Sequence, residues 1–114
     1  MTAGRRRTGC HGEDRAAAWY SENGFTVVAR NWRCDVGEID VIVRRGPLLV
    51  VAEVKTRTSD RFGHPAEAVD HRKQRRLRRL AARWLAESGE WFEELRFDVV
   101  AVTPRTVEVI PAAF

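Results

Sequence analysis

Cysteine is scarce in this chain, and its two copies indicate neither a metal cluster nor a covalent framework. Cys10 and Cys34 lie far apart among the 114 residues and form no Cys-x-x-Cys pair. We therefore expect free thiols in a reducing cytoplasm, with neither a zinc site nor disulfides. A chain of this length is expected to form one domain with a single modest core.

Long apolar runs are also absent, which predicts no membrane association. Residues 1–12 carry three successive arginines but lack the apolar segment that a secretory signal requires. We expect residues 1–11 to be a loose basic arm and residues 12–114 to be one folded domain in the cytoplasm.

Lysine is the third scarce residue type, because only two of the 20 basic residues are lysines and all the others are arginines. The formal net charge of +4 and the sequence pI near 9.8 favour a polyanionic partner. Nucleic acid is the default candidate. A background so rich in arginine singles out Lys55 and Lys73.

Hydrophobic periodicity predicts an α/β domain in the order αβββαββ, a mixed central sheet flanked by helices. Gly24 suits the end of the first helix, and Pro65 suits the first residue of the second, with a kink or a second start near His71 left open. The expected helices and strands cover residues 13–23, 25–30, 38–43, 48–55, 65–88, 97–102 and 107–110.

Two acidic residues and a lysine form the candidate catalytic group. Residues 44–47 make a tight connection between two strands, so a hairpin would bring Asp40 and Glu53 to the same end. Alternation along the strand places Lys55 on the same face as Glu53. Two carboxylates suffice for Mg²⁺ or Mn²⁺, because such ions also take water and phosphate oxygens as ligands.

Lys55 has two readings. An ammonium group shifts its pKa on burial and can orient or deprotonate an attacking water, which a guanidinium does not do. Alternatively, the lysine only keeps an exposed strand edge from pairing with another chain. The nearby Glu38 shares a strand face with Asp40, and it either joins the site or stays solvated. Asp98 interrupts an apolar strand and needs a partner, for which we expect Arg30 or Arg57.

The sequence resembles the YraN-like family of small bacterial proteins, within the PD-(D/E)xK, or restriction-endonuclease-like, nuclease superfamily. The resemblance spans residues 12 to about 100. It is carried by Gly12-Glu13-Asp14, Arg30-Asn31-Trp32-Arg33, Gly37-Glu38-Ile39-Asp40, Glu53-Val54-Lys55-Thr56-Arg57, Glu67-Ala68-Val69, Lys73 and Arg96-Phe97-Asp98-Val99-Val100.

The layout is also similar to that of archaeal Holliday-junction resolvases. This resemblance implies that Glu13 joins Asp40 and Glu53 as a metal ligand, and that the protein forms a homodimer acting on branched DNA. The superfamily proline before the aspartate is replaced here by Ile39. A simpler interpretation is that the Glu13 carboxylate, in the first turn of its helix, interacts favourably with the helix dipole.

A run of bases in the second helix predicts contact with a nucleic-acid backbone, although a solvated helix face explains it equally well. The expected nucleic-acid-binding residues are Arg57, Arg72, Lys73, Arg76, Arg79 and Arg83. Lys73 lies at the margin of the buried stripe and is expected to lean toward the site and touch a phosphate.

These observations together predict a Mg²⁺-dependent endonuclease acting on DNA, with Asp40, Glu53 and Lys55 as catalytic residues. Two alternatives remain open. One is a nucleic-acid-binding module or adaptor, in recombination or DNA uptake, whose site is idle. The other is an RNA-processing nuclease with the same metal chemistry.

Overall fold

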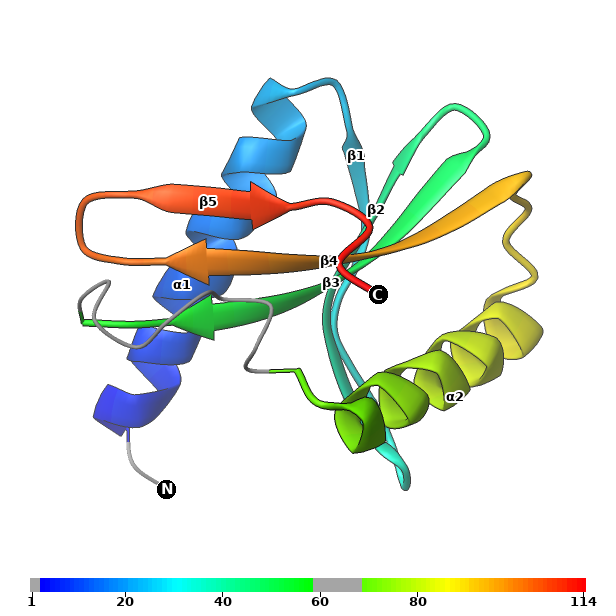
Figure 1. Cartoon of the computed structure of the whole chain (residues 1–114), viewed down its shortest axis with the longest axis horizontal. Helices are drawn as coiled ribbons and strands as arrows, with labels where there is room; N and C mark the ends of the chain where they lie inside the picture. Colours follow the sequence, from blue (N-terminus) through cyan, green and yellow to red (C-terminus); the bar gives the residue numbers. More distant parts are fainter. Residues whose placement is uncertain (1–2, 59–68) are drawn as a thin grey trace.

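The predicted order of helices and strands is confirmed by a computed structural model, which describes residues 3–58 and 69–114, with side chains from residue 11 onward (Figure 1). Five strands form one mixed sheet in the order β1-β2-β3-β4-β5, in which only β3 and β4 are parallel. The elements are α1 (Ala3–Glu22), β1 (Thr26–Cys34), β2 (Gly37–Arg45), β3 (Leu48–Thr56), α2 (His71–Ser88), β4 (Glu94–Val102) and β5 (Val107–Ile110).

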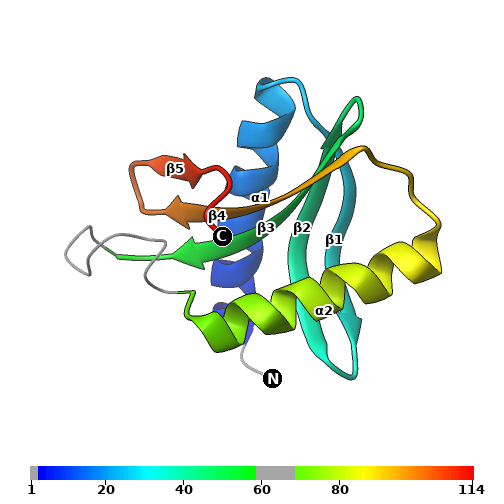
Figure 2. The same ribbon diagram turned by 45° about the vertical axis from the view of Figure 1, so that its right-hand side comes forward.

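The central strand, β3, is buried on both faces by the two helices. Its side chains alternate as the pleat requires: Leu48 and Val50 face the core under α1, whereas Leu49 and Val51 face the core under α2. The helices accordingly lie on opposite sides of the sheet in both views (Figure 1, Figure 2). Because α2 connects the parallel strands β3 and β4, its N-terminus comes close to the C-terminal end of β3.

The first helix begins at Ala3, so the backbone of residues 3–11, which we expected to be a loose arm, is helical. Sequence reasoning placed the helix start at Glu13. Gly12 instead lies inside α1, where the helix passes β3: an added Cβ would be 2.3 Å from Thr56 Oγ1. The glycine allows close packing and does not mark the end of a helix.

The other predicted boundaries need smaller corrections. Residues 31–34, expected in a connection, extend β1 to Cys34, and β4 begins at Glu94 because it pairs there with the start of β3. The second helix begins at His71 with Asp70 as its N-cap, and it ends at the left-handed Gly89, as predicted. Its predicted start, Pro65, lies outside the described residues.

Asp98 is buried, and among the arginines of the described contacts Arg96 is its partner. The Tyr20 hydroxyl donates to it at 2.7 Å, and Arg96 donates to both carboxylate oxygens at 2.9 and 3.0 Å. The backbone N–H of Ala112 adds a further bond at 3.1 Å. Arg30 pairs with Asp14 instead. The network ties α1 to β4 and to the chain after β5.

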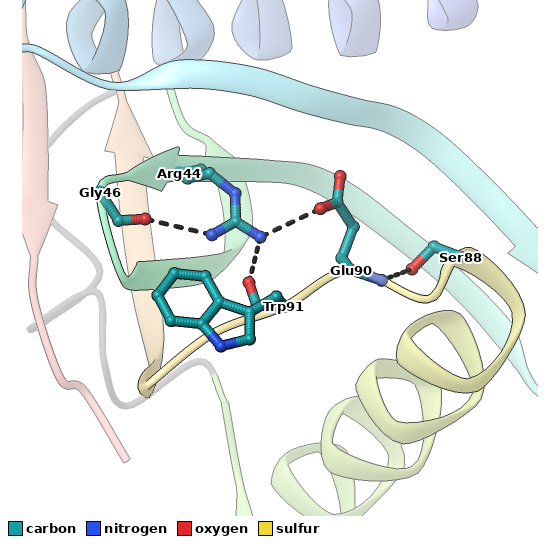
Figure 3. Close-up of polar contacts among 5 residues, drawn as sticks. All are labelled: Arg44, Gly46, Ser88, Glu90 and Trp91. Atoms are coloured by element: carbon teal, nitrogen blue, oxygen red, sulfur yellow. Dashed lines mark hydrogen bonds and ion pairs between the residues drawn. The ribbon is translucent and has the colours of Figure 1, made fainter.

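Arg44, at the end of β2, ties the β2–β3 turn to the segment that follows α2 (Figure 3). Its guanidinium donates to the Gly46 carbonyl and the Glu90 carboxylate at 3.1 Å each, and to the Trp91 carbonyl. These bonds anchor the far end of α2. Within residues 3–58 and 69–114, no helix is long and apolar enough to cross a membrane.

Candidate metal and phosphate site

The candidate site forms where β2 and β3 separate. Their ladder ends at the pair Val41 and Ala52, one residue short of the position at which Asp40 would face Glu53. Beyond that point the Asp40 carboxylate, in place of a backbone carbonyl, accepts the Val54 N–H at 2.8 Å. The structure thus brings Asp40 and Glu53 to the same end of the hairpin.

Three carboxylates from two elements converge at this opening. Glu13 of α1, Glu38 of β2 and Asp40 of β2 each place an oxygen within 4.8 Å of the others. Glu13 is only 9 % exposed, and the other two are partly buried. The resemblance that implied a role for Glu13 near Asp40 therefore matches its position, and Glu38 joins them.

Asn31 is a member of this cluster that sequence reasoning missed. It lies opposite Asp40 in the β1–β2 ladder, and its backbone is left-handed, with φ 52°. With its amide nitrogen turned toward the carboxylates, it donates to Glu13 at 2.8 Å and to Glu38 at 3.1 Å. Asparagine tolerates this backbone better than most residues. An asparagine within a strand rich in β-branched and aromatic residues was the available signal.

The crowding of negative charge has electrostatic consequences. Burial and the nearby Glu53 carboxylate raise the pKa of Asp40 to about 7. Burial and the neighbouring Glu38 also raise the pKa of Glu13. These raised pKa values mean that a further negative charge is unfavourable in the cluster, and a bound cation would relieve the repulsion.

Glu53 is 8 % exposed, and both lysines of the chain reach the same oxygen of its carboxylate. The Lys73 Nζ lies 2.6 Å from Glu53 Oε1, and the Lys55 Nζ lies 3.5 Å from it. Burial and the neighbouring Lys73 lower the pKa of Lys55. Burial by itself would lower the pKa of Lys73, but the hydrogen bonds to Glu53 and Lys55, together with the negative charges of Glu53 and Asp40, raise that pKa.

The remaining predicted contacts to nucleic acid are distributed unevenly. Arg72, Arg76 and Arg79 are exposed on α2, whereas Arg57 is partly buried just after β3. Arg83 is also exposed, and it forms ion pairs with Asp35 at 2.8 Å and with Glu87 at 3.1 Å.

A family model described as "Uncharacterised protein family UPF0102" matches residues 12–102. The chain belongs to this family. The match confirms the resemblance predicted from the motifs at the level of the family, and it includes every residue of the cluster described above.

Individual UPF0102 proteins are similar over most of their length. One from Beutenbergia cavernae is 56% identical over 94 residues, which cover 82% of this chain and 80% of the relative. One from Rhodococcus jostii is 52% identical, with the same coverage of each chain. One from Moorella thermoacetica is 48% identical, with both chains fully covered. These names assign the family and describe no reaction.

Proposed function

We propose that this protein is a metal-dependent endonuclease that cleaves DNA and belongs to the PD-(D/E)xK superfamily. One observation carries the proposal: three oxygen ligands converge at the open end of a hairpin, beside a buried glutamate and two lysines. Charges gathered at a cost to stability are typical of functional sites.

The donor set fits a hard divalent cation. Glu13, Glu38 and Asp40 offer only carboxylate oxygens, which are the ligands of Mg²⁺ and Mn²⁺. This set exchanges the predicted ligand Glu53 for Glu38, because Glu53 is engaged by lysine. When bound, such an ion supplies positive charge to a phosphate oxygen and lowers the pKa of a water molecule.

Lys55 acts on the phosphate side of the site. Its side chain is 29 % exposed and extends from the end of β3, next to Glu53. With its pKa lowered, the ammonium group exchanges a proton more readily than an exposed lysine does. It orients the attacking water and offsets the charge that develops on the phosphate oxygens.

The exposed arginines of α2 hold the DNA backbone. Arg72, Arg76 and Arg79 follow one another along the helix that begins beside Glu53. Guanidinium groups bind phosphates without reading base identity, so we propose selection by DNA structure, with branched DNA as the first candidate. Action as a homodimer on branched DNA is part of the proposal.

A nucleic-acid-binding module without turnover is the second candidate. The observation that favours it is the close ion pair between Lys73 and Glu53, which leaves one predicted catalytic carboxylate already neutralised. Under this alternative the arginines bind nucleic acid and the carboxylates serve only to hold a structural cation.

A cleavage panel separates the candidates. The purified protein is incubated with Mg²⁺ or Mn²⁺ and duplex, single-stranded, flap and four-way DNAs, and with RNA, beside Glu53→Ala and Lys55→Ala. Cleavage that is lost in both variants supports the nuclease, and the preferred substrate distinguishes DNA from RNA. Cleavage that survives both substitutions contradicts the proposed site. Binding without cleavage under every metal favours the second candidate.

A further inference from the structure

Both lysines of the chain converge on a single oxygen atom. They come from β3 and α2, and they lie 3.5 and 2.6 Å from Glu53 Oε1. Apart from these two, the Lys and Arg positions of the chain are all arginines, including Arg72 and Arg76 near Lys73 on α2. The lysine of α2, Lys73, and the lysine of β3, Lys55, thus meet at the same carboxylate.

Lys73 points differently from the arginines around it. Asp70 caps the helix by accepting the Lys73 N–H at 2.9 Å, which fixes the first turn of α2 at the end of β3. The Lys73 side chain is only 22 % exposed and reaches inward to Glu53, whereas Arg72 and Arg76 are exposed. Lys73 therefore faces the site, whereas the arginines Arg72 and Arg76 of the same helix face solvent.

A buried carboxylate must have a charged or hydrogen-bonding partner. Among the described residues, two cations reach Glu53, and the closer one is Lys73. If Lys73 were removed, Lys55 would be the nearest remaining cation and would be drawn fully onto Glu53. The presence of Lys73 thus leaves the Lys55 ammonium available for another anion.

We propose that Lys73 is a positioning residue that holds the Glu53 carboxylate and thereby leaves Lys55 to face the substrate phosphate. The role in cleavage rests on the proposed nuclease function, whereas the contact with Glu53 does not. A compact ammonium suits a carboxylate shared with a second lysine. The planar, five-donor guanidinium is bulkier and would crowd Lys55.

Lysine-selective ¹³C labelling tests the contact directly, because the chain yields only two lysine side-chain signals. Lys55→Arg and Lys73→Arg assign them. We expect Glu53→Gln to shift both signals, and Lys73→Met to shift the remaining signal of Lys55. The matched control Glu87→Gln, on the exposed face of α2, should shift neither. A Lys73 signal that ignores Glu53→Gln would overturn the proposal.

The kinetics of DNA cleavage test whether Lys73 acts as a positioning residue. Loss of a residue that orients a catalytic group commonly costs about 10- to 100-fold in activity. We expect Lys73→Met to lower kcat by this factor, while its KM for DNA rises no more than that of Arg76→Gln. Lys73→Arg should recover part of kcat. An unchanged kcat with only a raised KM would make Lys73 a phosphate contact and overturn the positioning role.

The two claims fail separately. If the wild-type protein cleaves no nucleic acid, the proposed function fails, and the lysine signals still decide whether Lys73 holds Glu53 and frees Lys55. If the wild-type protein cleaves and Lys73→Met cleaves equally fast, the nuclease stands and the positioning role is wrong.

Discussion

Replacing Glu13 by glutamine should stabilise the metal-free protein and weaken its response to metal. The substitution keeps an oxygen that accepts from Asn31 and removes one charge from a cluster whose ligand atoms lie within 4.8 Å of one another. Two unit charges at that separation repel by about 3 kcal/mol at an effective dielectric constant near 20. Arg30 offsets part of this repulsion, so we expect a gain of about 1–2 kcal/mol.

Urea unfolding with a chelator, and again with excess Mg²⁺ or Mn²⁺, measures both effects. A ligand at 100 times its Kd stabilises the folded state by about 2.7 kcal/mol, and we expect this increment in the wild-type protein but little of it in Glu13→Gln. The control Glu22→Gln makes the same chemical change at an exposed position of α1, where changes within about 0.5 kcal/mol are usual. Destabilisation by Glu13→Gln without metal, or a full metal increment in that variant, would refute the reasoning.

Three further predictions concern the core, the helix crossing and the basic surface. Tyr20→Phe removes a hydrogen bond to the buried Asp98 carboxylate and should cost about 1.5–3 kcal/mol in urea unfolding. Burial and the Asp98 carboxylate raise the pKa of Tyr20 in the folded state, so its contribution is fully present below about pH 10, where the unfolded tyrosine ionises, and is lost as the pH rises further. The chain has one tyrosine, so its tyrosinate absorbance should appear only together with unfolding, and ionisation of the native protein near pH 10 would contradict the network. Gly12→Ala should destabilise by about 1–3 kcal/mol because the new Cβ would overlap Thr56 Oγ1, and adding Thr56→Ala should restore most of the loss; additive effects of the two changes would argue against the close packing. Arg76→Gln should lower the slope of log affinity for DNA against log salt by about one, and an unchanged slope would remove that arginine from the interface.

Much of the fold follows from local sequence signals. The apolar run of β3, the Gly-Pro turn before it and the Gly89 cap act through neighbouring residues, so the pattern locates them. Local patterns placed the start of α1 at Glu13 and gave no role to Gly12, which lies inside the helix. Its actual role, close approach to Thr56 across the fold, is a tertiary effect that no short window contains.

Part of the site was also predictable from local sequence signals. The hairpin connects Asp40 and Glu53 through a short turn, so pleat and register bring them together. Asn31 is a left-handed residue of β1, and its contact with the carboxylates depends on how that strand packs. The sequence indicated that Lys73 leans toward the site, but its pairing with Glu53 depends on where the first turn of α2 packs. Asp98 pairs with Arg96, which lies two residues away on the same strand. Arg96 was therefore nearer in the sequence than the arginines that we considered.

The most direct test of a metal-dependent nuclease at this site is the single-turnover rate of DNA cleavage in Mn²⁺ by Asp40→Asn. The matched control is Asp35→Asn, which makes the same change at an exposed aspartate in the β1–β2 turn. Loss of an outer partner of a metal site already costs up to about 100-fold, so we predict at least that loss for Asp40→Asn and a near wild-type rate for the control. Equal rates for the two variants would contradict the account.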